Sequence, residues 1–160
     1  MATETRELKI TTPSDLEIVL ERAFEAPREL VFAAFTEEEH IPQWMLGPEG
    51  WTMPVCEIDL REGGAWRVVW RKAEGEEMAI TGVITEVAPP ERFVKTEVWG
   101  GDWPETLNTT SFVEDGDRTI VTETMLYPSK DARDRALASG MEGGTSISYD
   151  RLDAYLATLA

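Results

Sequence analysis

The fold is decided by residues 139–156, SGMEGGTSISYDRLDAYL, which lie in a helical pattern that runs from Ser129 to Leu159. Apolar and small residues recur there at spacings of three and four, which places them on one face of a helix. That face carries large side chains at both ends and small ones in its middle. Its members are Leu137, Met141, Thr145, Ser148, Leu152, Tyr155 and Leu159.

Two kinds of residue mark the beginning and the interior of this helix. Ser129 is suited to be the N-cap, and Asp131 suits the first turn, where the helix dipole favours negative charge. Gly140, Gly143 and Gly144 lie inside the pattern, and each glycine costs about 1 kcal/mol relative to alanine in a helix interior. We therefore expect the helix to bend or break near these glycines.

Working outward from the helix, the preceding chain alternates apolar and polar residues in short segments separated by turn residues. This pattern predicts seven strands, and the short connections between neighbours indicate an antiparallel meander. The strands are expected at 16–24, 51–60, 64–73, 77–87, 92–99, 106–114 and 118–127.

Two short helices are expected after the first strand. Pro27 suits a first helical position, and helical spacing continues to about residue 36. Thr36 and Glu39 form a capping-box pattern that predicts a second helix ending near Met45. The resulting order of elements predicts an α+β fold, in which a curved antiparallel sheet is covered on its concave face by the long helix.

The chain has 160 residues, with 15 Lys and Arg against 31 Asp and Glu, a net charge of −16. This length suits a single domain, expected at 15–160 after a polar, partly disordered segment at 1–14. The negative charge disfavours binding to nucleic acid or to an anionic membrane surface. No apolar run approaches the roughly 18 residues that a membrane-spanning helix needs, so no membrane insertion is expected.

The chain contains one cysteine, Cys56, and one histidine, His40. These counts exclude an internal disulfide and a site built from several histidines, and we expect no metal and no cofactor. Cys56 is expected to be an inert buried thiol, and His40, beside three glutamates, a solvated side chain. The beginning of the chain lacks the apolar segment of a signal peptide, and an unpaired cysteine suits a reducing compartment, so we expect a cytoplasmic protein.

The small middle of the helix face predicts a gap between the helix and the sheet. Two interpretations stay open: large rings from the sheet fill the gap, or the gap is an apolar pocket that holds a ligand. Tryptophans in the strands and methionines, which adapt their shape, are the natural lining. The candidate cavity residues are Arg22, Trp44, Met45, Cys56, Trp66, Trp70, Met78, Trp99, Met125, Met141, Thr145 and Ser148.

Several charged residues lie within the apolar phase of their strands. Lys95 and Glu97 are in phase with Phe93, and Arg22 and Glu123 also fall at apolar positions. If they face inward, they must pair with one another or meet a ligand, because an unpaired buried charge is costly. A register slip of one residue turns every such side chain to the other face, so both orientations stay open for Lys95 and Glu97.

Four segments then show a resemblance to a known family. They are ERAFEAPRELVFAAFTEEEHIPQWM (Glu21–Met45), VCEIDLREGGAWRVVWR (Val55–Arg71), EVAPPERFV (Glu86–Val94) and SGMEGGTSISYDRLDAYL (Ser139–Leu156). Over about residues 15–160 the chain resembles the family related to the C-terminal domain of the activator of heat-shock protein 90 ATPase, within the SRPBCC or START-like superfamily. The resemblance implies a helix-grip fold, with the sheet wrapped around the C-terminal helix over a hydrophobic cavity.

Three functions are compatible with this resemblance, since a fold does not determine a function. The first is binding of a small hydrophobic or amphipathic molecule in the cavity. The alternative is a polyketide-cyclase-like or lyase-like enzyme, for which Glu97, Glu123 and His40 are the candidate catalytic groups. The third, less favoured, is a co-chaperone or stress-response interaction module. A homodimer is possible, and the sequence does not specify one.

Overall fold

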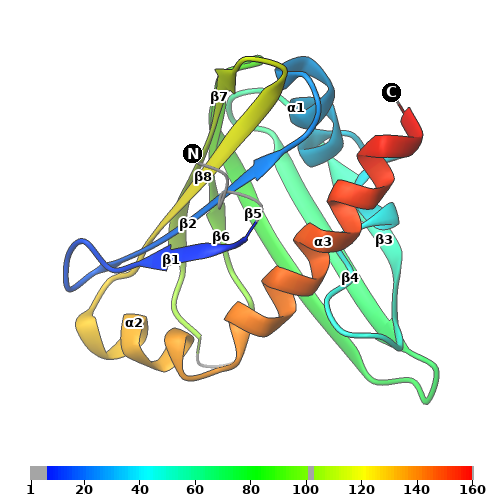
Figure 1. The fold of residues 1–160 in the computed structure, drawn as a ribbon. Helices are drawn as coiled ribbons and strands as arrows, with labels where there is room; N and C mark the ends of the chain where they lie inside the picture. Colours follow the sequence, from blue (N-terminus) through cyan, green and yellow to red (C-terminus); the bar gives the residue numbers. More distant parts are fainter. Residues whose placement is uncertain (1–6, 101–102, 160) are drawn as a thin grey trace.

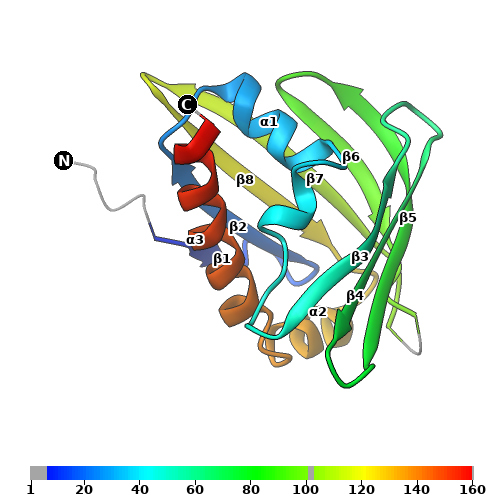
Figure 2. The ribbon, with the colours of Figure 1, turned by 90° about the vertical axis from the view of Figure 1, so that its right-hand side faces the viewer.

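The computed structural model describes residues 7–100 and 103–159. Its centre is an eight-stranded antiparallel sheet in the order β1-β2-β8-β7-β6-β5-β4-β3. The sheet curves strongly, and helix α3 crosses its concave face, as Figures 1 and 2 show from two directions. The predicted α+β helix-grip architecture is therefore confirmed.

Each of the seven predicted strands is present, with ends within two residues of the expected ones. The sheet also contains one strand that was not predicted, β1. The strands are β1 (Lys9–Thr11), β2 (Glu17–Phe24), β3 (Trp51–Ile58), β4 (Ala65–Lys72), β5 (Glu77–Ala88), β6 (Arg92–Glu97), β7 (Thr106–Asp115) and β8 (Arg118–Leu126). The helices are α1 (Arg28–Thr36), the 3-10 turn η2 (Ile41–Gln43), α2 (Lys130–Leu137) and α3 (Met141–Leu159).

The additional strand, β1, lies in the segment that was predicted to be polar and partly disordered. It forms one edge of the sheet and pairs with β2, with Ile10 opposite Leu20. Ile10 packs against the buried residues Ile18 and Leu20, which explains why so short a segment joins the sheet. The prediction of seven strands is therefore wrong by one. Residues 1–6 of that N-terminal segment lie outside the described residues.

The second helix predicted after the first strand is present only as a short 3-10 helix and does not have the predicted cap or length. Thr36 is the last residue of α1 rather than an N-cap, because its hydroxyl donates a hydrogen bond of 2.8 Å to the Phe32 carbonyl oxygen. The following segment makes only the three-residue turn η2, without a side-chain cap. Pro27 was expected to be the first helical residue and is instead the N-cap of α1, so this helix begins one residue later than predicted.

The predicted long helix is broken where the glycines indicated. Helix α2 ends at Leu137, and Gly140 has a φ of 88°, a left-handed conformation that favours glycine. The Ser129 hydroxyl accepts a hydrogen bond from the Ala132 amide, as expected of an N-cap.

None of the helices in the described part of the chain has the length and apolar character that a membrane crossing requires.

The buried face also differs from the one predicted for a single long helix. Leu137 and Leu159, predicted to be on the buried face, are each 38 % exposed. The side chains that enter the core are Tyr149, Leu152 and Leu156. The Tyr149 ring contacts three aromatic rings, edge-to-face with Phe24 and Phe35 and tilted against Trp44, a favourable arrangement for aromatic pairs.

Two glycine substitutions test this packing in opposite directions. A Cβ atom at Gly82 would lie 1.9 Å from the Thr96 carbonyl oxygen and 2.4 Å from the Trp66 Nε1 atom. We expect Gly82→Ala to lower the free energy of unfolding by about 2 kcal/mol or more. Gly143 has open space around its Cα, so Gly143→Ala is expected to raise it by up to about 1 kcal/mol. Urea unfolding measures both, and equal effects would contradict the structure.

Candidate functional site

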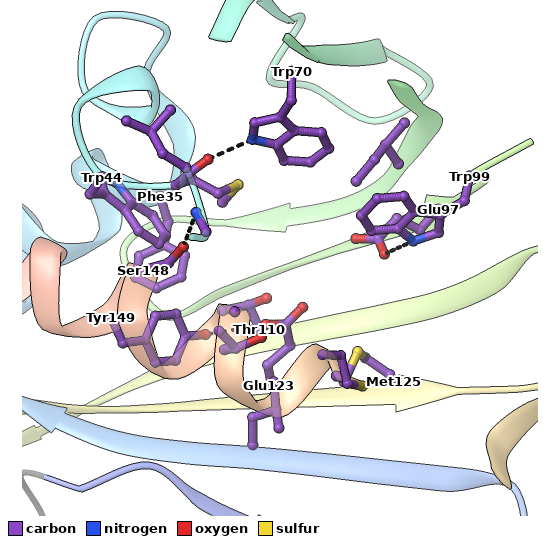
Figure 3. Close-up of a pocket in the computed structure, with 18 of the residues that line it drawn as sticks. Phe35, Trp44, Trp70, Glu97, Trp99, Thr110, Glu123, Met125, Ser148 and Tyr149 are labelled. Atoms are coloured by element: carbon purple, nitrogen blue, oxygen red, sulfur yellow. Dashed lines mark hydrogen bonds between the residues drawn. The ribbon is translucent and has the colours of Figure 1, made fainter. Parts of the chain in front are cut away.

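A cavity of about 320 Å³ lies between the concave face of the sheet and the first half of α3. Its volume equals that of roughly ten water molecules and is at the lower end of the range for small-molecule sites. Figure 3 shows Trp70 and Trp99 on one side, with Glu123 and Tyr149 on the other. The gap that the small residues of the helix predicted is therefore a cavity rather than a volume filled by rings.

Trp66, Trp70 and Trp99 are among the large side chains that the sheet and its turns contribute to the wall. The Trp66 indole donates a hydrogen bond of 2.9 Å to the Thr96 carbonyl oxygen, and the Trp70 indole donates one of 2.7 Å to the Met45 carbonyl oxygen. Trp70 and Trp99 stack with ring centroids 5.6 Å apart and planes 7° from parallel. Because the backbone satisfies the Trp66 and Trp70 N–H groups, these two side chains present apolar ring surface to the cavity.

The loop between η2 and β3 closes the cavity beside α3. The Gly47 amide donates a hydrogen bond of 2.8 Å to the Ser148 hydroxyl. The Arg151 guanidinium donates to the carbonyl oxygens of Trp44 and Gly47, at 3.1 and 3.0 Å. These contacts hold the loop against α3. Gly144 and Thr145 are too small to fill the space that remains.

Two charged residues of β6 face the cavity. The Lys95 ammonium lies 3.8 Å from a Glu97 carboxylate oxygen, and each side chain is only 12 % exposed. The same ammonium lies 3.8 Å from the centroid of the Trp66 ring, a cation–π contact. The orientation that the sequence left open is therefore inward for both residues, because they share the sheet face of the buried Phe93.

Glu123 of β8 is the most perturbed acid of the cavity wall. It lies opposite Leu20 of β2 and Thr110 of β7. Its carboxylate accepts a hydrogen bond of 3.2 Å from the Tyr149 hydroxyl. Desolvation, and then the negative charge of Glu97, raise the pKa of Glu123 from 4.5 to about 7. The same burial, with the nearby Glu123 charge, raises the pKa of Tyr149, which remains a neutral donor.

Most of the side chains that sequence analysis assigned to the cavity do lie on its wall. They are Trp44, Met45, Trp66, Trp70, Met78, Trp99, Met125, Met141, Thr145 and Ser148. The candidate acids Glu97 and Glu123 lie there too. Whether these residues bind a ligand stays a prediction.

Two predicted cavity residues lie elsewhere. Arg22 is buried, but its guanidinium donates hydrogen bonds to the Tyr149 carbonyl oxygen and the Asp150 carboxylate at 3.1 Å, so it anchors α3 rather than facing the cavity. Cys56 is half-buried on β3, opposite Val68, and does not line the cavity. Burial raises the pKa of the Cys56 thiol to about 11, which suits the inert thiol that was expected.

His40 is neither in the cavity nor freely solvated. Its side chain is 12 % exposed, and its Nδ1 atom lies 2.7 Å from the Tyr155 hydroxyl. Its Nε2 atom faces carboxylate oxygens of Glu37 and Glu39 at 3.6 and 3.8 Å. Within the described residues these three are the group whose ligand atoms lie close enough together to hold a metal ion. Both glutamates are largely exposed, and no second feature points to an ion there.

Sequence reasoning missed two polar residues of the wall. Tyr149 lies four positions after Thr145 and three before Leu152, so its spacing was a usable signal. Thr110 is two residues from the buried Phe112 on β7 and shares its face. Of the η2–β3 loop, Trp44 and Met45 were predicted, whereas Leu46, Gly47 and Pro48 were missed, because the path of a loop is not encoded in a periodic pattern.

An antiparallel sheet that curves around a C-terminal helix over a cavity defines the helix-grip class of folds. A protein from Rhodobacter sphaeroides is similar over 95 % of this chain and 99 % of its own, with 31 % identity and a TM-score of 0.91. An AHSA1 protein from Silicibacter pomeroyi is 27 % identical over 90 % of this chain and 99 % of its own, with a TM-score of 0.70. No functionally curated protein matches the chain.

The family model described as Activator of Hsp90 ATPase homolog 1-like protein matches residues 25–157. The chain belongs to this family. The resemblance found in the sequence is therefore confirmed.

The perturbed carboxyl group predicts how stability depends on pH. The folded-state pKa of Glu123 is raised above its unfolded value of 4.5. Between about pH 4.5 and 7 the folded protein therefore binds more protons than the unfolded chain. Stability is therefore lost as the pH rises through this window, by up to about 3 kcal/mol. Glu123→Gln removes this loss.

Urea unfolding of wild type and Glu123→Gln at pH values on both sides of this window measures the difference. We expect the variant to gain stability relative to wild type as the pH rises, with no further gain above pH 7. A difference that is the same at all pH values would contradict the assignment.

Proposed function

We propose that the protein binds a small hydrophobic or amphipathic molecule in the cavity between the sheet and α3. The observation that carries this proposal is an apolar cavity of about 320 Å³ whose wall also holds a few polar groups. Aromatic and methionine side chains with a small number of placed polar groups are typical of small-molecule sites. Membership of the family supports a ligand-binding fold in general terms.

The mouth of the cavity supports entry of a ligand from solvent. Met78 and Trp99 line the cavity and are 42 % and 39 % exposed, whereas Trp66 and Trp70 deeper in the wall are buried. Large exposed apolar side chains at the rim of an apolar cavity are typical of sites that a ligand covers. The wall thus passes from an exposed apolar rim to a polar floor at Glu123.

A second candidate function is an enzyme that abstracts a proton, as a lyase or a cyclase does. The observation in its favour is the carboxyl group of Glu123, whose pKa near 7 suits a general base. The carboxylate would take a proton from a carbon beside a ligand carbonyl, and the Lys95 ammonium would stabilise the enolate oxygen. Deuterium incorporation into phenylacetone in heavy water tests this, because Glu123→Gln should abolish any acceleration by wild type.

Blocking the cavity tests the proposed binding function. Thr145 lines the cavity from α3, whereas Ile147 on the same helix is 43 % exposed and is not part of the wall. Thr145→Trp places a ring in the cavity and is expected to weaken ligand binding by at least about tenfold, while the matched control Ile147→Trp leaves it unchanged.

The measurement is native mass spectrometry of protein purified from its own host, followed by titration with the molecule that it retains. Circular dichroism checks that both variants fold. Equal retention of the molecule by wild type and folded Thr145→Trp would place the binding site elsewhere. A cavity that retains nothing from its host and binds nothing in a panel of fatty acids, sterols and aromatic polyketides would contradict the proposed function.

A further inference from the structure

We propose that the ligand of this cavity is a small amphipathic amine, whose apolar body lies against the tryptophans and whose ammonium group pairs with the carboxylate of Glu123. This inference rests on the proposed binding function and names its ligand class. It is carried by the distribution of charge within the cavity and by the aromatic surface around it.

The charged groups on the wall are the carboxylates of Glu97 and Glu123 and the ammonium of Lys95, which pairs with Glu97 and also attracts Glu123. The Lys95 ammonium is already held between the Glu97 carboxylate and the face of Trp66, each 3.8 Å away. The partner of the Glu123 carboxylate is the neutral phenol of Tyr149, and in the described part of the chain Glu123 forms no ion pair. Lys95 and Glu97 cancel, so the ionised cavity has a charge of about −1 that a monovalent cation would neutralise.

The aromatic side chains favour the same class of ligand. The faces of tryptophan rings attract cations, and ammonium ligands are commonly recognised by groups of aromatic side chains. The cavity already shows this chemistry with a protein group, since the Lys95 ammonium lies over Trp66. The stacked rings of Trp70 and Trp99 line the same cavity, and within residues 7–100 and 103–159 the cation–π contacts involve other rings. Trp70 and Trp99 provide the apolar surface for the body of the ligand.

The remaining observations disfavour an anionic ligand. A carboxylate that approached Lys95 would lie beside Glu97 and in the same small cavity as Glu123, and both would repel it. The whole chain carries a net charge of −16, which attracts cations and repels anions during the approach from solvent. A neutral alcohol or ketone meets no such repulsion, and its comparison with an amine is therefore the central part of the test.

Pairing with an ammonium makes the binding depend on pH. The groups that face Glu123 are Glu97 and Lys95 of β6, Tyr149 of α3 and Tyr127 at the end of β8, with the uncharged Thr110 and Leu20 on either side. Without a ligand the carboxyl group titrates near pH 7. A bound ammonium favours the ionised form, so binding below pH 7 releases a proton, and the affinity for an amine rises with pH.

Three probes of nearly equal shape separate the ligand classes: 4-phenylbutylamine, 4-phenylbutanol and 4-phenylbutyrate. Titration calorimetry measures the dissociation constant of each for the whole protein at about pH 6 and pH 8. The amine keeps its charge at both values, because alkylammonium groups titrate near pH 10. We expect the amine to bind at least about tenfold more tightly than the alcohol at about pH 8, and about tenfold more weakly at about pH 6 than at about pH 8.

Two variants locate the effect. Glu123→Gln keeps the shape of the side chain and removes its charge, so we expect the preference for the amine and its pH dependence to disappear while the alcohol binds as before. Glu57→Gln on β3 is the matched control. It removes an exposed carboxylate that does not line the cavity, so the preference for the amine and its pH dependence should persist.

The outcomes distinguish this inference from the function on which it rests. If the alcohol or the butyrate binds to wild type as tightly as the amine, the ligand class is wrong and the binding function stands. An amine affinity that is independent of pH would also overturn the role of Glu123, and this result needs no variant. If none of the three probes binds at about millimolar concentration, the ligand class is contradicted, and the proposed function is then tested by the host-purified protein and the panel described above.

Discussion

The arrangement of this protein depends on how α3 is packed along its length. Its second half is embedded in the aromatic core through Tyr149, Leu152 and Leu156. Its first half presents Gly144 and Thr145, which do not reach the opposite wall. The Ser148 hydroxyl and the Arg151 guanidinium bind the η2–β3 loop at the boundary between the two halves. Because α3 is anchored at one end and carries small side chains at the other, the curved sheet cannot close onto it there, and a cavity remains.

The electrostatics of the cavity follow from the same enclosure. Glu97 and Glu123 are close enough to influence each other, and burial raises the pKa of Glu123 to about 7. A surface acid would be fully ionised at this pH and would have little effect on stability. The Lys95 ammonium stabilises Glu97 and lies over Trp66, so the positive charge in the cavity is already used. The cavity is thus an apolar space with one polar end, and that end is able to change its charge near neutral pH.

Sequence reasoning identified the wall better than it identified the connections. The tryptophans and methionines predicted for the cavity lie on its wall, because alternation in a strand and spacing in a helix are local properties, whereas Trp51 also lines it and was not predicted. Arg22 was correctly placed on the inner face, but its guanidinium binds Asp150 and the backbone of Tyr149, partners more than a hundred residues away. The capping box at Thr36 was misread because the hydroxyl has an alternative acceptor within α1. Such competition between local partners is decided by packing.

The sequence by itself determined the order of the elements, the inner phase of most strands, the break at Gly140 and the small middle of the C-terminal helix. These features depend on periodicity and on the conformational preferences of single residues, which act over a few positions. Only the tertiary structure decided the eighth strand, the inward orientation of Lys95 and Glu97, and the meeting of Tyr149 with Glu123. Strand register and the approach of distant segments result from the packing of the whole chain, and a shift of one residue would have turned those charges to solvent.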